Sequence, residues 1–98
     1  MNLSSLFGGA TEFTLQLPTG DRVRVSAHGG QVLHWSVDDG DELLYLSPDA
    51  SIDEGQAIRG GIPICWPQFS TRGPLPKHGF ARNATWRLHG QDDTSLLL

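Results

Sequence analysis

The sequence predicts an all-β protein, and two features of the 98-residue chain support this. Twelve glycines and six prolines are spread along it, and the longest stretch without either is 80–89. A mean α-helix has about 11–12 residues, so this punctuation leaves little room for helices. Apolar residues also alternate with polar ones in several short runs, which is the period-two pattern of a half-buried strand. The sequence therefore predicts short strands joined by turns.

The first predicted unit is a hairpin. Its first strand has apolar residues at Phe13, Leu15 and Leu17, and the run 23–27 alternates in the same way after a turn at 18–21. The proline, glycine and aspartate of that turn favour reversal of the chain. We expect one face of this hairpin to be buried and the other to be solvated.

Further strands are predicted along the rest of the chain. The run 33–37 resumes the alternation, and the apolar run 43–46 predicts a strand covered on both faces. Near the C-terminus, alternation at 86–88 and the apolar run 94–98 predict two more strands separated by a turn. An apolar end exposes an unpaired edge. We therefore expect residues 1–98 to be the N-terminal part of a single larger β-sandwich domain, truncated at the C-terminus. A small complete sandwich is the alternative.

The charge balance argues against a nucleic-acid partner. Seven Lys plus Arg stand against eleven Asp plus Glu, a net charge of −4, whereas a nucleic-acid binder of this size normally carries a basic stripe. The acidic residues gather at 38–42 and 92–93. A local cationic pocket for a small anion is compatible with this balance, because net charge says little about a single site.

Membrane and metal binding are not expected. No apolar run approaches the roughly 20 residues of a spanning helix, and the N-terminus lacks the basic start and apolar core of a secretory signal. We expect a cytoplasmic location. The single cysteine, Cys65, excludes an intrachain disulfide and a cysteine-based zinc site, and the four histidines show no ligand spacing. Its apolar neighbours favour a buried Cys65 over a nucleophile.

The segment 57–82 breaks the alternating pattern. Pro63 and Pro67 stand among large apolar side chains, and a central strand does not tolerate proline. We interpret the segment as a rigid, partly buried loop, on which scaffolds often place a site. Arg59 precedes two glycines, and its guanidinium can offer a fork of donors to a phosphate or carboxylate. A salt-bridged surface arginine is the alternative. The run 78–82 likewise carries polar groups among small and apolar residues, here a histidine and an arginine.

Four motifs carry a resemblance to a known family. They are Ala-His-Gly-Gly-Gln-Val-Leu-His-Trp at 27–35, Leu-Tyr-Leu-Ser at 44–47, Ile-Arg-Gly-Gly-Ile-Pro-Ile-Cys-Trp-Pro-Gln-Phe at 58–69 and His-Gly-Phe-Ala-Arg-Asn at 78–83. With these motifs the chain closely resembles, over nearly its whole length, the hexose-6-phosphate mutarotases, or glucose-6-phosphate 1-epimerases. These belong to the aldose 1-epimerase and galactose-mutarotase-like superfamily.

The resemblance implies a large antiparallel β-sandwich that interconverts the α and β anomers of a hexose 6-phosphate. One group takes the proton of the anomeric hydroxyl and another protonates the ring oxygen, so that the ring opens and closes again. Two positioned acid–base groups suffice and no cofactor is needed. The resemblance places the catalytic histidine and glutamate farther along the chain, beyond Leu98, and no catalytic residue within it. The full-length protein is expected to be a monomer.

The same resemblance assigns four substrate-binding residues: Arg59, Lys77, His78 and Arg82. The two arginines fall on the family's phosphate-binding positions, and His78 matches a histidine that helps to hold the sugar in related epimerases. Lys77 departs from the glutamine of some members, and the sequence at 68–70 also departs from the family pattern. The alternatives are a non-catalytic sugar-phosphate-binding β-module, an inactive truncated remnant, and a structural domain that keeps the loop for packing.

Overall fold

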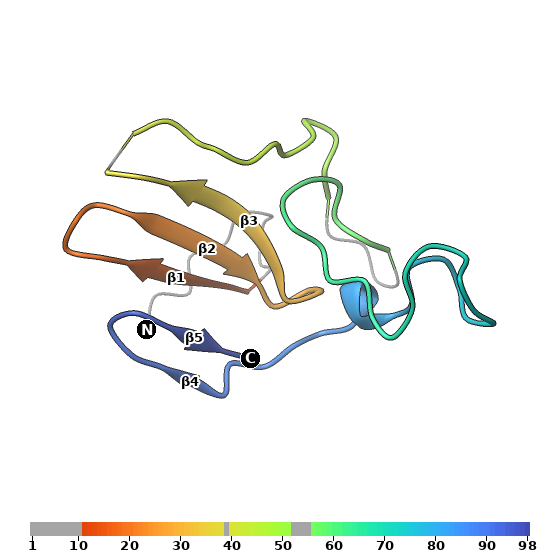
Figure 1. Cartoon of the computed structure of the whole chain (residues 1–98). Coiled ribbons are helices and arrows are strands. Elements are labelled where there is room, and N and C mark those ends of the chain that lie inside the picture. Colours follow the sequence, from red (N-terminus) through yellow and green to blue (C-terminus); the bar gives the residue numbers. More distant parts are fainter. Residues whose placement is uncertain (1–10, 39, 52–55) are drawn as a thin grey trace.

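The computed structural model describes residues 11–38, 40–51 and 56–98. Within them, the elements are β1 (Glu12–Gln16), β2 (Arg22–Ser26), β3 (Gln31–Ser36), the single 3-10 turn η1 (Ala81–Asn83), β4 (Gly90–Gln91) and β5 (Leu96–Leu97). All the pairings between these strands are antiparallel. The predicted all-β class is confirmed (Figure 1).

The first three strands form one sheet in the order β1-β2-β3. The hairpin between β1 and β2 closes through two backbone bonds of 2.9 Å, in which Leu17 donates to Asp21 and Gly20 donates to Leu17. β2 and β3 then pair with a register irregularity between Arg24 and Val25. The three predicted strands at this end of the chain are therefore confirmed, with their turn in the expected place.

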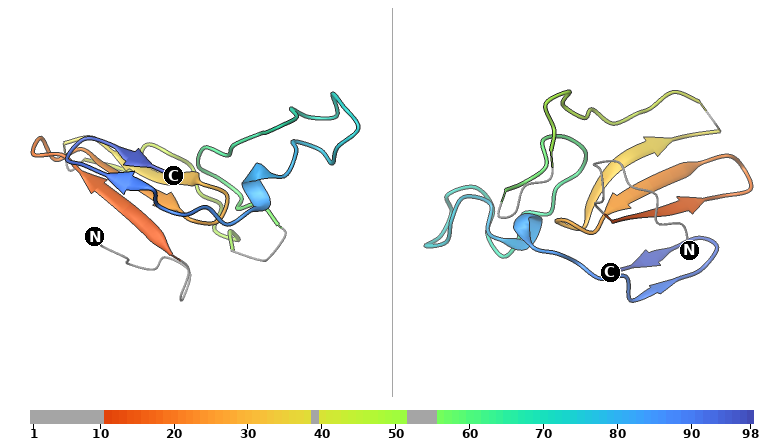
Figure 2. Two further views of the ribbon diagram at one scale, coloured as in Figure 1. Left: turned by 90° about the horizontal axis from the view of Figure 1, so that it is seen from below. Right: turned by 180° about the vertical axis from the view of Figure 1, so that it is seen from behind.

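The last two strands form a separate hairpin next to β1. The Gln91 side chain donates to the Thr14 carbonyl at 3.2 Å, which ties β4 to the edge of the first sheet (Figures 1 and 2). The predicted strand at 86–88 is wrong: Thr85 forms only an isolated bridge with His28, and the strand ladder begins at Gly90. Trp86 is engaged elsewhere: its backbone N–H donates to Ala27 at 2.7 Å and its indole N–H donates to Ala81 at 2.9 Å.

The predicted strand at 43–46 is also wrong. The segment forms no strand ladder: it has isolated bridges at its two ends, one between Glu42 and Ser36 and one between Leu46 and Gly60. Between these bridges, Leu43 is 54% exposed and Tyr45 is 72% exposed, so neither is covered as a doubly buried strand requires. Apolar composition alone did not distinguish a covered strand from an extended surface segment.

Both faces of the sheet are covered at one end, so the expectation of one solvated face is wrong there. The apolar side chains of Phe13, Val25 and Leu33 are buried in the core, and the cross-strand row of Glu12, Ser26 and Gln31 is fully buried as well. Two contacts engage this polar row, although Oε2 of Glu12 and Oε1 of Gln31 have no hydrogen-bond partner among the described residues. Glu12 forms a 3.0 Å ion pair with Arg24, and the Gln31 amide donates to backbone carbonyls of the 57–62 segment.

Glu42 fastens the end of β3 to the segment that follows it. One carboxylate oxygen accepts from the backbone N–H of Trp35 at 2.8 Å and of Leu44 at 2.9 Å, and the other lies 2.7 Å from Nδ1 of His34. Partial burial alone would raise the pKa of Glu42. The two backbone donors and His34 outweigh it and hold that pKa below its usual value.

We expect Glu42→Gln to lower the free energy of unfolding by about 1 kcal/mol at pH 7, because it removes charge-assisted hydrogen bonds at a half-exposed site. A carboxylate whose folded pKa is depressed stabilises the fold above its unfolded pKa and loses that effect as the pH falls through the folded pKa. The difference from the parent should therefore shrink below about pH 4. Urea unfolding of the complete protein at pH 7 and below about pH 4 measures this difference in the free energy of unfolding. The exposed Asp41→Asn is the control. An equal difference at both pH values would contradict this account.

Candidate functional site

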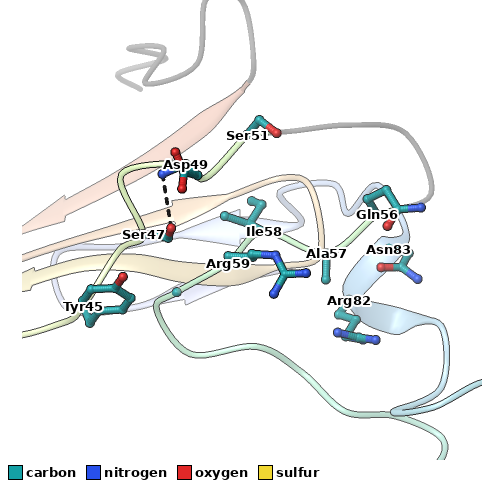
Figure 3. Close-up of a pocket in the computed structure, with 11 residues that line it drawn as sticks. Tyr45, Ser47, Asp49, Ser51, Gln56, Ala57, Ile58, Arg59, Arg82 and Asn83 are labelled. Carbon is teal, nitrogen blue, oxygen red and sulfur yellow. Dashed lines mark hydrogen bonds between the residues drawn. The ribbon is translucent and has the colours of Figure 1, made fainter.

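A cavity of about 690 Å³ lies where the segments around 45–51 and 56–60 meet η1 (Figure 3). Its volume is within the range of small-molecule sites. The cavity is lined by Tyr45, Ser47, Asp49, Ser51, Gln56, Ala57, Ile58, Arg59, Gly60, Arg82 and Asn83.

Arg59 is held on the wall of this cavity by its backbone. Its carbonyl accepts from Ser47 at 3.0 Å, and the Gly61 N–H donates to the Tyr45 carbonyl at 2.7 Å. The preceding side chain, Ile58, is buried in the core and anchors the segment. These contacts fix the backbone on both sides of Arg59. Its exposed side chain projects into the cavity, where Figure 3 shows it reaching toward Arg82 and Asn83.

Arg82 reaches the same cavity from η1. The turn is anchored by the buried Ala81, whose carbonyl accepts from the Trp86 indole. One terminal nitrogen of Arg82 donates to the Lys77 carbonyl at 3.2 Å. Its Nε is buried and has no hydrogen-bond partner among the described residues, and the same holds for Oδ1 of Asn83. A guanidinium has five N–H donors, so the terminal nitrogens of Arg82 keep donors for a ligand beside the bond to Lys77.

The lining of the cavity is cationic, although the chain as a whole is acidic. Two arginines, Arg59 and Arg82, and one carboxylate, Asp49, are its charged members among the described residues. Guanidinium groups present planar forks of donors that match the oxygens of phosphate and carboxylate groups. The hydroxyls of Tyr45 and Ser47 add neutral polar contacts. The arrangement suits a polar anion with further hydroxyl groups.

The structure brings together two of the four predicted site residues. Arg59 and Arg82 share the cavity, whereas Lys77 and His78 do not line it. Lys77 is exposed and touches the site only through its carbonyl. The His78 ring lies 5.4 Å from that of Phe69, and its Nδ1 accepts a 3.0 Å bond from a backbone N–H.

The sequence reasoning missed several residues that line the cavity. Tyr45 was interpreted as part of a covered strand, Ser47 belonged to a motif used only for its resemblance, and Gln56 and Asn83 carried no separate signal. Asn83 directly follows Arg82 in the 78–83 motif, so the position beside a candidate arginine was the signal available. No sequence pattern marks the close approach of the 45–51 segment.

The loop that follows Ile62, which is itself bridged to Val32 of β3, extends away from the sheet, as both views in Figure 2 show. Gln68 is buried and braces it. Its amide nitrogen donates to the carbonyls of Ser70 at 2.8 Å and Leu75 at 3.0 Å, while its oxygen accepts from the Leu75 N–H at 2.9 Å. A glutamine at this position therefore has a structural task in this chain.

Cys65 is half-buried, so the prediction of a buried cysteine is wrong, and it does not line the cavity. A nucleophile must reach the substrate. We therefore expect Cys65→Ser in the complete protein to leave turnover within about twofold of the parent. A loss of several orders of magnitude in a well-folded variant would show instead that this thiol takes part in the reaction.

The parts of the chain that the structure describes contain neither a metal-binding group nor a membrane-spanning helix. No three His, Cys, Asp or Glu side chains are grouped there so that they could hold a metal ion. None of the described segments forms a helix with the length and apolar character to cross a membrane.

The fold and the cavity together define a β-sheet protein with a cationic small-molecule pocket, which lies between η1 and the segments around 45–51 and 56–60. Residues 11–98 match the aldose 1-epimerase family. The chain belongs to this family.

Comparisons with curated proteins agree with this assignment. The chain is 57% identical over 61 residues to a protein of Cenchrus ciliaris and 43% identical over 74 residues to one of Salmonella typhimurium, both named "Putative glucose-6-phosphate 1-epimerase". The alignments cover 62% and 71% of this chain. They cover 18% and 25% of those relatives, so the chain spans a quarter or less of their length.

Solved structures show the same fold. The crystal structure of a "putative mutarotase (YeaD)" of Salmonella typhimurium matches with a TM-score of 0.70 and 29% identity, over 96% of this chain and 37% of that one. The crystal structure of HI1317 matches with a TM-score of 0.71 and 29% identity, over 90% of this chain and 35% of that one. The described strands therefore correspond to part of a larger mutarotase fold.

Proposed function

We propose that the protein interconverts the α and β anomers of glucose 6-phosphate or a related hexose 6-phosphate, and that these residues supply the substrate-binding half. The observation that carries the proposal is the pair of arginines that line one cavity, in a chain whose net charge is −4. Names of the curated relatives support the choice of a sugar phosphate. In this proposal the residues form the N-terminal part of a single β-sandwich domain.

The phosphate is assigned to the arginine pair. Arg59 reaches the cavity as an exposed side chain, and Arg82 has a buried Nε without a partner among the described residues. A phosphate dianion between them would receive charge-assisted hydrogen bonds from both forks. Lys77 and His78 do not line the cavity, so their assignment to the rest of the substrate rests on the family resemblance alone.

The reaction needs one group that removes the proton of the anomeric hydroxyl and one that protonates the ring oxygen. Ring opening yields the aldehyde, rotation turns its face, and ring closure returns both protons. The proposal assigns this acid and this base to residues beyond Leu98, so the role of the residues described is to bind and orient. No cofactor takes part in these steps.

Exchange between the α and β anomers of glucose 6-phosphate, followed by NMR, tests this proposal in the complete protein. Catalysed exchange of glucose 6-phosphate, with much slower exchange of unphosphorylated glucose, is the expected result. Equal rates for the two sugars would remove the role of the phosphate. No catalysed exchange of either sugar would refute the activity.

A non-catalytic sugar-phosphate-binding module is the second candidate. It is favoured by the lining of the cavity, in which the described residues include Asp49 but no histidine. The two candidates differ in one result. Binding of glucose 6-phosphate without catalysed anomer exchange by the complete protein would select the module.

A further inference from the structure

Gln31 holds the backbone on both sides of Arg59. The residue is fully buried, and its amide nitrogen donates to the carbonyl of Ile58 at 3.0 Å and to that of Gly60. These two carbonyls flank Arg59 along the chain. A single side chain at the start of β3 therefore fixes the segment from which the Arg59 guanidinium projects.

The same turn that precedes β3 also holds the segment of the second arginine. The Gly29 N–H donates to the Ala84 carbonyl at 2.7 Å, and the Ala27 carbonyl accepts from Trp86 at 2.7 Å. Gly29 has φ of +78°, and a Cβ there would lie 2.5 Å from the Arg82 carbonyl oxygen. The turn thus lies against the backbone of η1 and of the residues just after it.

His28 adds a third connection from this turn to the cavity. Its Nε2 lies 2.5 Å from the carbonyl of Gln56, a cavity-lining residue. A carbonyl oxygen only accepts hydrogen bonds, so Nε2 carries the proton and donates. Its backbone N–H is occupied by the Ser26 hydroxyl at 3.1 Å. Both ends of the 56–60 segment are therefore tied to the turn.

From these contacts we propose that the 27–31 turn sets the spacing of Arg59 and Arg82, and that Gln31 is the positioning residue for Arg59. The inference rests on the proposed function, because it takes the arginine pair as the phosphate site. Two guanidinium groups can both bind one phosphate only when the distance between them matches its size. A small displacement of either group therefore weakens binding. Gln31 does not itself line the cavity, so it acts through Arg59.

A double-mutant cycle separates this role from general stabilisation. In the complete protein, the dissociation constant of glucose 6-phosphate is measured by calorimetry for the parent, Gln31→Met, Arg59→Ala and the double variant. Gln31→Met keeps the volume and removes the amide donors. It should weaken binding about fivefold to tenfold in the parent and less than twofold in the Arg59→Ala background.

Hydrogen exchange supplies a readout that does not depend on the ligand. The N–H of Ser47 bonds to the Arg59 carbonyl, and that of Gly61 bonds to Tyr45. Both should exchange faster in Gln31→Met. Gln68→Met is the matched control: it removes another buried amide that holds backbone, so it should speed exchange at Leu75 and leave Ser47 and Gly61 unchanged.

The outcomes separate the two proposals. If Arg59→Ala loses affinity but a folded Gln31→Met does not, positioning by Gln31 is refuted and the phosphate site stands. The same conclusion follows if Gln31→Met weakens binding equally in the parent and in the Arg59→Ala background. If Arg59→Ala binds like the parent, the phosphate site fails and the positioning role falls with it. Should Gln31→Met not fold, Gln31→Leu replaces it, since it also removes the donors and adds no buried charge.

Discussion

Arg59→Ala and Arg82→Ala are each expected to raise KM for glucose 6-phosphate about tenfold to a hundredfold while changing kcat much less. The phosphate lies far from the reacting carbon, so its contacts stabilise ground state and transition state almost equally. Steady-state kinetics of the complete protein measures the effect. Arg→Lys at either position should restore affinity only in part, because lysine lacks the planar fork.

The matched control for this experiment is Arg87→Ala. Arg87 is exposed and does not line the cavity, so its loss removes a charge without removing a fork. It should leave KM within about twofold. Unphosphorylated glucose should be a poor substrate and nearly insensitive to all of these changes. If folded Arg59→Ala and Arg82→Ala variants handle glucose 6-phosphate like the parent, the arginine pair is not the phosphate site.

Gly61→Ala is expected to lower the free energy of unfolding by about 2–4 kcal/mol. Gly61 has φ of +64°, a conformation that costs an L-residue about 1–2 kcal/mol. A Cβ there would also run into the Val32 carbonyl. To relieve this clash, the backbone at Gly61 would have to move away from β3. That movement would strain the hydrogen bonds from Gly61 to Tyr45 and from Ile62 to Val32, each contributing about 1 kcal/mol.

Gly90→Ala is the matched control for this change. Gly90 lies in β4, and a Cβ added there meets nothing within 4 Å. Its effect should stay within about 1 kcal/mol. Urea unfolding of both variants in the complete protein measures the difference. Equal effects of the two substitutions would show that the close approach of Gly61 to β3 does not constrain the fold.

The part of the fold that depends on local pattern was predictable from sequence. Alternation and turn chemistry placed β1, β2 and β3, because each of these strands pairs with its neighbour along the chain. The failures at 43–46 and 86–88 have another origin. Both segments make long-range contacts, through Leu46 with Gly60 and through Trp86 with Ala27, that no local period encodes.

The candidate site was predictable only in part, for a similar reason. Arg59 and Arg82 stood out because each lies in a motif rich in glycine and apolar residues, and the structure places both on one cavity. The burial of Gln31 was not foreseen. Gln31 lies just before the predicted strand run 33–37, so the alternation assigned its side chain to neither face. Its amide gains two carbonyl partners only because the 57–62 segment, distant in the sequence, packs beside it.

A crystal structure of the complete protein with glucose 6-phosphate bound tests the central claim most directly. The account predicts the phosphate group between the guanidinium groups of Arg59 and Arg82, within hydrogen-bonding distance of both, in the cavity that Tyr45 and Asn83 also line. A phosphate group bound elsewhere, with neither arginine in contact, would contradict it.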